Sequence, residues 1–361
     1  MSSFRNLYIH IPFCRSKCDY CAFYSEAGRE DLIAAYLCRL KEDIVAAELP
    51  DAIDTVYIGG GTPTLLSPQM LRELISIIPQ AEERTIEANP ETLNPEKISI
   101  LADNFSRISL GIQSFDPQLR RILGRDCSQN AIENALKLID HAQFRHWNID
   151  LIYGIGTQTL SAWEWELEQA MNWPIDHLSC YALTREENTR LAPDAQTLDH
   201  EEREADMAEL TREVIHRRLT QYEISNYACP GGECRHNLNV WHGKRYLGIG
   251  AAAASFDGKD RWNQAADIEA YINHCSVEID ILAPGERARE VFAVNLRTVE
   301  GWSSSSWREA ELAVSIDWTQ MVEKIAIIAE KYPGLIDYGA DFIRLTQRGR
   351  DFWDIIAGEL I

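Results

Sequence analysis

The stretch Tyr8-Ile-His-Ile-Pro-Phe-Cys-Arg-Ser-Lys-Cys-Asp-Tyr-Cys21 carries three cysteines directly after a short run of β-forming apolar residues. Cys14, Cys18 and Cys21 have the spacing C-x3-C-x2-C. Three thiolates can hold three irons of a cubane 4Fe-4S cluster, which leaves the fourth iron open to a small molecule that binds through a nitrogen and an oxygen. The loop therefore predicts an iron-sulfur cluster with one open coordination position.

A zinc site and free thiols are the alternatives for these cysteines, and a disulfide framework is disfavoured. A structural zinc site normally has four ligands, often from paired C-x2-C knuckles, and no second knuckle accompanies this loop. The chain has nine cysteines, an odd number, and no secretory leader is evident. This pattern favours a cytoplasmic protein in a reducing compartment over a disulfide framework.

Composition and charge limit the classes of function. The length of 361 residues allows about two domains, and no apolar run is long enough to span a bilayer. The formal net charge of −21 disfavours nonspecific binding to nucleic-acid phosphates, which depends on Lys and Arg. We therefore expect a protein that neither spans a membrane nor binds nucleic acid.

Short apolar runs alternate with segments of helical period over the first half of the chain. We expect strands at Leu7–Ile11, Thr55–Ile58, Thr85–Ala88, Arg107–Ile112, Asn148–Tyr153 and His177–Tyr181, and helices near 30–48, 67–78, 95–103, 128–142 and 160–171. This alternation predicts an α/β fold of parallel strands joined by crossover helices, either a partial (β/α)6 TIM-like barrel or a curved open sheet. From about residue 265 helices with short strands predict a smaller, mostly helical C-terminal domain. We place the domains at residues 1–255 and 256–361.

Polar residues follow or end the predicted strands. The cysteine loop follows the first strand, and the stretch 59–63 (Gly-Gly-Gly-Thr-Pro) follows the second. Glu87 closes the third strand, Gln113 closes the fourth, and Asp150 lies within the fifth. Ligands of parallel α/β sheets bind outside the carboxyl ends of the strands. The order of these residues along the chain therefore predicts one shared pocket.

The cysteine spacing resembles that of the radical S-adenosylmethionine (SAM) superfamily. In that superfamily the reduced cluster passes an electron to bound SAM, which is cleaved to methionine and a 5'-deoxyadenosyl radical. The glycine stretch matches the superfamily segment that contacts the SAM amino group. Glu87, Gln113, Arg125 and Asp150 supply an ammonium acceptor, an amide, a guanidinium for a carboxylate and an acceptor for ribose hydroxyls, which are the groups that SAM requires. Taken singly, each of these side chains could as well be a helix cap or a surface residue.

The remaining candidates have structural alternatives. Tyr8 and Tyr20 flank the cysteines and could pack on the cluster or the adenine, or belong to the core. His10 is more consistent with a buried structural histidine. Four further cysteines, Cys38, Cys127, Cys180 and Cys275, have no metal-like companions and are expected to be buried small hydrophobes. Cys229 and Cys234, with His236, could form a second metal or redox site.

Longer motifs resemble the oxygen-independent coproporphyrinogen III oxidases and the related HemW heme chaperones. They are Tyr8-Ile-His-Ile-Pro-Phe-Cys, Gly59-Gly-Gly-Thr-Pro-Thr, Glu87-Ala-Asn-Pro, Gly111-Ile-Gln-Ser-Phe, Asn148-Ile-Asp-Leu-Ile-Tyr-Gly, Tyr222-Glu-Ile-Ser-Asn-Tyr, His236-Asn and Asn295-Leu-Arg. The resemblance spans nearly the whole chain. It implies that the three loop cysteines hold the cluster. The SAM-site residues that it implies are Tyr8, Tyr20, Gly60, Gly61, Thr62, Glu87, Gln113, Arg125 and Asp150.

Two features separate the branches of this family. The oxidases carry a further cysteine two residues after the third ligand, where this chain has Phe23, and an extension before the cluster loop. The stretch Arg235-His-Asn-Leu-Asn-Val-Trp is similar to the H-N-x-x-Y-W signature of HemW proteins, which makes His236, Asn237 and Trp241 candidates for a heme site. The chain departs from that pattern at Val240, where the signature has tyrosine, and at Ala254, where family members commonly carry histidine.

The resemblance implies a radical SAM protein that binds heme and delivers it to acceptor proteins. It also implies an electron donor such as flavodoxin or ferredoxin, and it leaves the oligomeric state open, with a homodimer among the options. The enzymatic alternative is a radical reaction on a tetrapyrrole, such as the decarboxylation of a coproporphyrinogen propionate. A third alternative is a cluster-bearing electron carrier that never cleaves SAM, although it leaves the SAM residues unexplained.

Overall fold

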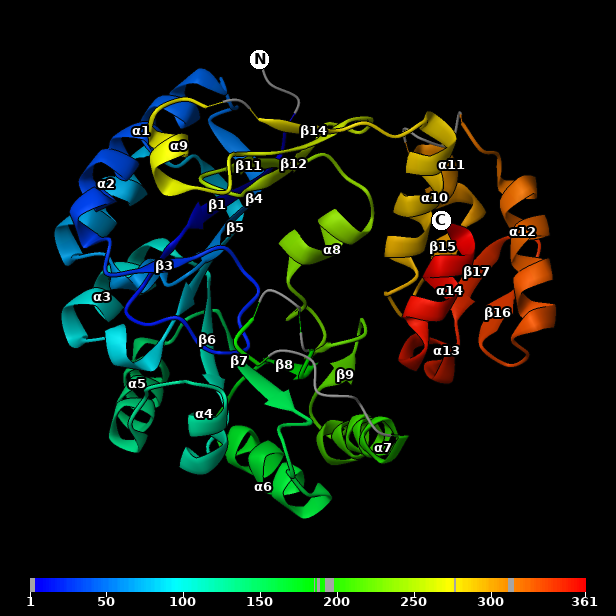
Figure 1. Cartoon of the computed structure of the whole chain (residues 1–361), viewed down its shortest axis with the longest axis horizontal. Helices are drawn as coiled ribbons and strands as arrows, with labels where there is room; N and C mark the ends of the chain where they lie inside the picture. Colours follow the sequence, from blue (N-terminus) through cyan, green and yellow to red (C-terminus); the bar gives the residue numbers. More distant parts are fainter. Residues whose placement is uncertain (1–3, 185, 187–188, 192–197, 276, 311–314) are drawn as a thin grey trace.

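A curved sheet forms the centre of the larger part of the molecule (Figure 1). The computed structural model describes residues 4–361 except 185, 187–188, 192–197, 276 and 311–314. In this part of the chain the sheet contains nine strands, in the spatial order β11 (Leu247–Ile249), β1 (Asn6–Ile11), β4 (Ala52–Gly60), β5 (Gln80–Ala88), β6 (Arg107–Gln113), β7 (His146–Tyr153), β8 (His177–Ala182), β10 (Asn226–Ala228) and β9 (Thr220–Gln221). The six neighbours from β1 to β8 run parallel, as the alternating pattern predicts.

Crossover helices connect these six strands. They are α1 (Ile33–Ala46), α2 (Pro68–Ile77), α3 (Pro95–Asn104), α4 (Pro117–Ile122), α5 (Gln129–Ala142) and α6 (Leu160–Met171). Figure 1 shows α1, α2, α3, α5 and α6 along the outside of the curved sheet. The predicted partial (β/α)6 barrel is confirmed, and α4 is a short helix that the sequence pattern did not predict.

Polar residues before the apolar periods begin several of these helices. Ser67 accepts a hydrogen bond from the backbone of Met70, and Asn94 does the same for Lys97. A proline follows both caps at the first helical position, where its missing N–H has no intrahelical partner to lose. These local signals explain why the helix boundaries follow from the sequence.

The two faces of the sheet differ in character. Along β1, Leu7, Ile9 and Ile11 are fully buried in the main hydrophobic core, in contact with the outer helices. Because side chains alternate across a strand, Tyr8 and His10 lie on the other face, toward the inside of the partial barrel. The inner face is largely polar on several strands. The candidate site lies on this face, at the carboxyl ends of the strands.

Short parallel and antiparallel pairings extend the sheet at both ends. β11 comes from far along the chain and pairs parallel to β1, so that Leu7 is opposite Leu247. At the other end β10 pairs antiparallel to β8 and to β9. The sequence pattern did not predict these three strands, each of which is no longer than three residues.

The rest of the chain forms the connecting extension and a C-terminal part. The extension contains α7 (Leu198–Ile215), α8 (Arg235–Trp241), α9 (Ile268–Ile272) and a sheet of β12 (Ala254–Phe256), β13 (Arg261–Asn263) and β14 (Glu278–Asp280). The C-terminal part contains α10 (Pro284–Asn295), α11 (Ser304–Glu309), α12 (Trp318–Lys331), α13 (Gln347–Asp351) and α14 (Trp353–Leu360), with a sheet of β15 (Trp302–Ser303), β17 (Phe342–Leu345) and β16 (Ile336–Tyr338). It is mostly helical, as predicted.

The C-terminal part has its own hydrophobic core, built on residues such as Phe292, Trp302 and Trp307. Phe256 already belongs to this second core, whereas Ile268 and Tyr271 of α9 pack in the main core. The chain therefore crosses between the two cores before α10, and the boundary after residue 255 stays a prediction. No helix among the described residues has both the length and the apolar character needed to cross a membrane.

Candidate functional site

The cysteine loop is a closed excursion at the carboxyl end of β1. Two short strands, β2 (Phe13–Cys14) and β3 (Glu26–Ala27), pair at its base, and the backbone N–H of Glu26 donates to the carbonyl of Pro12 at 2.8 Å. Cys14, Cys18 and Cys21 are all free and partly exposed. The closed base holds the three thiols at the mouth of the partial barrel.

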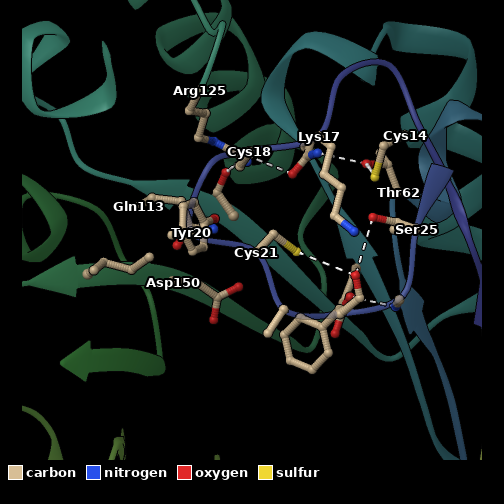
Figure 2. A pocket seen from close by; sticks show the side chains of 18 of the residues that line it. Cys14, Lys17, Cys18, Tyr20, Cys21, Ser25, Thr62, Gln113, Arg125 and Asp150 are labelled. Atoms are coloured by element: carbon tan, nitrogen blue, oxygen red, sulfur yellow. Dashed lines mark hydrogen bonds between the residues drawn. The ribbon is translucent and has the colours of Figure 1, made fainter. Parts of the chain in front are cut away.

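A cavity of about 400 Å³ lies beneath this loop at the carboxyl ends of the strands. Its lining includes all three loop cysteines and eight of the nine predicted SAM-site residues: Tyr20, Gly60, Gly61, Thr62, Glu87, Gln113, Arg125 and Asp150. Figure 2 shows Cys14 and Thr62 together on one side of this cavity and Gln113 and Asp150 on the other. The predicted shared pocket is present, and Tyr8 is the one predicted residue that does not line it.

The three glycines at the end of β4 are required by close packing. A Cβ on Gly59 would lie 2.8 Å from a carboxylate oxygen of Glu87, and one on Gly61 would lie 3.0 Å from Sγ of Cys14. Gly60 has a φ of +111°, which L-residues rarely adopt, and its Cβ would meet the His10 ring at 2.7 Å. The glycines therefore let β4 approach both the cysteine loop and the carboxylate of β5.

Glu87 is a partly buried carboxylate that lines the cavity. It accepts hydrogen bonds from the Tyr57 hydroxyl at 2.8 Å and from the backbone N–H of Gly60 at 3.1 Å. Burial raises its pKa to about 7, Asp150 adds to this effect, and the two hydrogen bonds partly oppose it. No cation pairs with Glu87 among the described residues, so the cavity offers a site for a positively charged group.

Asp150 is the second carboxylate in the lining. Its oxygens accept hydrogen bonds from Ser109 at 2.9 Å and from Asn148 at 2.7 Å. Burial raises its pKa, and the hydrogen bonds limit the rise. The carboxylate is thus fixed in orientation at the cavity wall and can accept hydrogen bonds from a ligand.

Arg125 connects the cysteine loop to the strand ends. It donates to Sγ of Cys18 at 3.7 Å, to Oδ1 of Asn89 at 2.7 Å and to the carbonyl of Gly111. Its buried Nε has no partner, and the groups it contacts are a thiol and two neutral oxygens. A negatively charged thiolate or ligand carboxylate nearby would pair with the positive charge of the Arg125 guanidinium.

Asn89 is a site residue that residue-level reasoning missed. It accepts from Arg125 and donates through Nδ2 to Oγ1 of Thr62 at 2.8 Å, and Thr62 in turn donates to Sγ of Cys14 at 3.7 Å. The signal was its place two residues after Glu87, at the end of the same strand. Asn89 thus connects the carboxyl ends of β4 and β5 to the cysteine loop through hydrogen bonds.

Gln113 has an unusual backbone. Its φ is +71°, and the pairing of β6 with β7 shifts register between Gly111 and Gln113. Glu166 of α6, which is 1 % exposed, stabilises the following turn by accepting hydrogen bonds from the Ser114 hydroxyl and from the backbone N–H of Phe115 at 2.6 Å. This strained geometry presents Gln113 to the cavity and depends on a carboxylate 53 positions further along the chain.

Tyr8 and His10 do not line the cavity. The Tyr8 hydroxyl bonds to Nδ1 of His10 at 2.9 Å, and Nε2 of His10 bonds to the carbonyl of Tyr24 at 2.8 Å. Burial lowers the pKa of His10. The residue is a neutral, hydrogen-bonded structural histidine, consistent with the sequence-based expectation.

The geometry also tests the alternative cysteine sites. Among the described residues, no three His, Cys, Asp or Glu side chains lie close enough together to ligate one metal ion. Cys127 and Cys180 are buried as expected, but Cys38 and Cys275 are exposed, so that expectation was wrong for these two.

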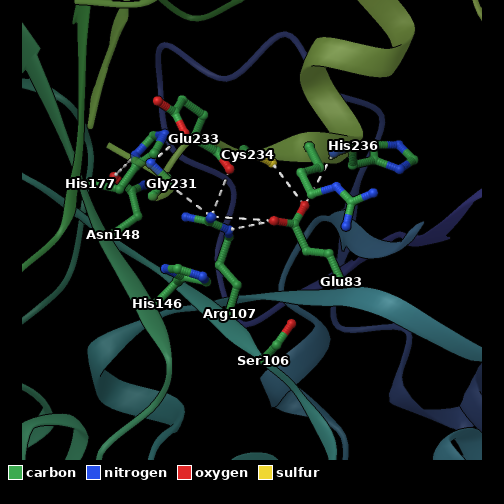
Figure 3. A network of polar contacts seen from close by, with 12 residues as sticks. Glu83, Ser106, Arg107, His146, Asn148, His177, Gly231, Glu233, Cys234 and His236 are labelled. Atoms are coloured by element: carbon green, nitrogen blue, oxygen red, sulfur yellow. Dashed lines mark hydrogen bonds and ion pairs between the residues drawn. The ribbon is translucent and has the colours of Figure 1, made fainter. Parts of the chain in front are cut away.

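The region around α8 carries the signature residues, and a buried polar network anchors it (Figure 3). Arg107 of β6 pairs with Glu83 of β5 at 3.2 Å and donates to the carbonyls of Gly232 and Glu233, each at 2.9 Å. Glu83 also accepts from the backbone N–H of His236 at 3.1 Å. The α8 segment is therefore fixed against the inside of the barrel.

His236 itself is buried. Its Nδ1 bonds to Oγ1 of Thr55 at 2.8 Å, and burial lowers its pKa to about 3. Asn237 is partly exposed, and Trp241 lies under the guanidinium of Arg297, 5.4 Å from its ring centre. The second metal site suggested by Cys229, Cys234 and His236 does not form, because Cys234 contacts Glu83 and the three side chains do not gather.

The fold and the cavity together define a protein of the radical SAM class. The profile of the radical SAM superfamily matches residues 8–170. The chain is 32% identical to the heme chaperone HemW of Mycobacterium tuberculosis, across 98% of this chain and 94% of that protein. It is 30% identical to HemW of Bacillus subtilis, across 96% of each chain. The chain belongs to the HemW family.

A solved structure shares the fold over its whole extent. The radical SAM enzyme coproporphyrinogen III oxidase (HemN) of Escherichia coli matches with a TM-score of 0.82 at 21% identity, covering 99% of this chain and 90% of that one. At this identity the likeness establishes the architecture of barrel and C-terminal part.

Proposed function

We propose that this protein binds a 4Fe-4S cluster, SAM and heme, and that it delivers heme to acceptor proteins. One observation carries the proposal: the three loop cysteines share a single cavity with two partly buried carboxylates, Glu87 and Asp150, neither of which forms an ion pair within the described part of the chain. Heme delivery rests on the family, since the relatives at 30% to 32% identity are named heme chaperones.

The residues of the cavity fit a cluster and SAM. Cys14, Cys18 and Cys21 would hold the cluster, which when bound supplies one electron for the cleavage of SAM. Glu87 would accept the SAM ammonium, because its carboxylate faces the cavity beside the glycine stretch. Asp150 would accept from the ribose hydroxyls, since Ser109 and Asn148 already orient it.

Arg125 and Gln113 would complete the recognition of SAM. The guanidinium of Arg125 lies beside Cys18 and Asn89, where it offsets negative charge on the thiolate or on the SAM carboxylate. Gln113 would bind through its amide, in a position set by the left-handed backbone. Tyr20, which lines the same cavity, would shield the cluster from water.

The surroundings of the cluster loop support a protein electron donor. Phe23, two residues after the third cysteine, is 70 % exposed, and Arg15 in the same loop is exposed. We propose that an acidic donor such as flavodoxin or ferredoxin docks at this rim, in the cytoplasm.

The decisive experiment offers anaerobically reconstituted protein heme and coproporphyrinogen III in separate assays. We expect heme to bind, and no vinyl-bearing product to form, because Phe23 stands where the oxidases carry a further cysteine. The Cys18→Ser variant serves as the cluster-free control, and Cys38→Ser, on the exposed face of α1, as the matched one. Product that depends on Cys18 would replace this proposal with the oxidase alternative.

A further inference from the structure

A chain of hydrogen bonds runs through the inside of the barrel from Asp150 to the start of α8. Nδ2 of Asn148 donates to Oδ1 of Asp150 at 2.7 Å, and Oδ1 of Asn148 lies 2.7 Å from Nδ1 of His177. Nε2 of His177 lies 2.8 Å from the Tyr222 hydroxyl, which accepts from the backbone N–H of Cys234 at 3.3 Å. Figure 3 shows His177 beside Asn148 in this network. The chain therefore connects the wall of the cavity beneath the cysteine loop with the residue that precedes α8.

Alternation along two neighbouring strands brings the strand residues of this chain to one face. Asn148 and Asp150 are two positions apart on β7, and His177 and Ser179 are two positions apart on β8, so each pair points to the same side of its strand. In the parallel register Asn148 is opposite His177, and Asp150 is opposite Ser179. His177 and Asn148 are each 3 % exposed. The contact between them is thus set by the sheet and closed to solvent.

The protonation of His177 follows from its neighbours. Oδ1 of Asn148 can only accept a hydrogen bond, so Nδ1 of His177 carries a hydrogen and donates it. Burial lowers the pKa of His177, and Arg107 and His146 add to the lowering, so the ring is neutral at pH 7. Nε2 is then an unprotonated acceptor, and the Tyr222 hydroxyl donates to it. Each nitrogen of the ring therefore has one defined role.

The direction of the chain fixes both oxygens of Asp150 as acceptors. Nδ2 of Asn148 donates to Oδ1, and the Ser109 hydroxyl donates to Oδ2 at 2.9 Å. Reversing the Asn148 amide would place its carbonyl against the Asp150 carboxylate and its NH2 against the Nδ1–H of His177, which is unfavourable at both ends. His177 therefore holds the amide in the orientation that donates to the carboxylate.

We propose that His177 is a positioning residue for nucleoside recognition, which orients Asp150 toward the ribose hydroxyls of SAM through Asn148. This inference rests on the proposed binding of SAM, and it adds a residue that does not line the cavity. His177 makes no contact with the ligand; it donates one hydrogen bond and accepts another. Tyr222 fixes the tautomer of His177, and Cys234 anchors Tyr222 at the start of α8.

The test is a calorimetric titration of the full-length, cluster-loaded protein, kept oxidised so that SAM is not cleaved. One ligand is SAM, and the other is a SAM analogue whose ribose lacks both hydroxyls. His177→Phe keeps a ring and removes both nitrogens. We expect its SAM Kd to rise about tenfold, the loss that corresponds to one hydrogen bond to a charged group, and its Kd for the analogue to stay at the wild-type value. A general loss of packing would weaken both ligands alike.

The neighbouring His146 provides the matched control. It lies on β7 and is hydrogen-bonded to a carboxylate, that of Asp176, but it is not a member of the chain. His146→Phe should lower the melting temperature and leave the Kd of both ligands unchanged. The pair of variants thus separates stability from recognition of the ribose.

Two further variants test the route from His177 to the ligand. Tyr222→Phe removes one hydroxyl and keeps the ring, so that the hydrogen of His177 is no longer confined to Nδ1; the SAM Kd should rise about threefold, again without a change for the analogue. In an Asp150→Asn background, His177→Phe should cause no further loss of SAM affinity, because both changes act on the same contact.

An unchanged SAM Kd in His177→Phe, or an equal loss for the two ligands, would overturn the inference and leave the proposed function standing. If His177→Phe does not fold, the same two outcomes in Tyr222→Phe decide the question. Failure of the wild type to bind SAM would overturn both the inference and the proposed SAM site.

Discussion

The partly buried carboxylate of Glu87 gives SAM binding a predictable dependence on pH. Its pKa of about 7 means that half of the ligand-free protein carries a protonated Glu87 at neutral pH. An ammonium group binds the carboxylate, so the proton must leave on binding, and affinity falls as the pH decreases below 7. With that pKa, the Kd should rise about fivefold between pH 7 and pH 6, or about 1 kcal/mol. The α-amino group of the ligand stays largely protonated in this window, since its usual pKa is about 7.7 to 8.0.

Isothermal titration calorimetry of cluster-loaded protein with SAM at pH 6.0, 6.5 and 7.0 measures this effect. Glu87→Gln should bind more weakly at pH 7, by about 1.5 to 3 kcal/mol for the loss of a charged hydrogen bond, and its Kd should not vary over the window. Glu82→Gln, an exposed change on the same strand, should keep the wild-type slope. A Glu87→Gln variant with the same pH slope as the wild type would refute the assignment of Glu87 to the ammonium.

Three further outcomes follow from the contacts. Cys18→Ser should lose most of the cluster absorption at about 410 nm, and the control variant Cys38→Ser should keep it. Full iron and sulfide content in the Cys18 variant would contradict the cluster assignment. Glu166→Gln should lower the free energy of unfolding by about 2 kcal/mol and weaken SAM binding, because the turn at 114–116 loses a charged hydrogen-bond acceptor. Urea denaturation measures the free energy of unfolding, and calorimetry measures the SAM affinity. An unchanged SAM affinity would argue against a positioning role for Glu166. Arg107→Met should lower the free energy of unfolding by about 3 to 5 kcal/mol, because it leaves Glu83 buried without its cation. Adding Glu83→Gln should restore part of this loss, as measured by thermal unfolding. A double variant less stable than the single variant would show that the broken ion pair does not cause the destabilisation.

The barrel could be predicted because its signals are local. Each of the six parallel strands is a short β-forming run between helical periods, and caps such as Ser67 and Asn94 begin the helices. The order of polar residues at strand ends then predicted which side chains share the cavity. The carboxyl ends of parallel strands meet at one edge, so sequence order alone was sufficient.

Other features depend on contacts between distant parts of the chain. Glu166 gave no local sign that it stabilises the turn after Gln113, and the three residues of β11 are too few to show a period. The exposure of Cys38 and Cys275 was mispredicted because cysteine composition says nothing about which face of a helix or turn a residue occupies.

The pairing of β11 with β1 has a consequence for synthesis in the cell. The strand that leads into the cysteine loop is made first, yet one of its two neighbours, Leu247–Ile249, leaves the ribosome about 240 residues later. At about 5 to 20 residues per second, the nascent chain spends some tens of seconds with one edge of β1 unpaired. An unpaired strand edge is a template for pairing with other chains, so the nascent chain is most exposed to such misassociation until translation has passed residue 249.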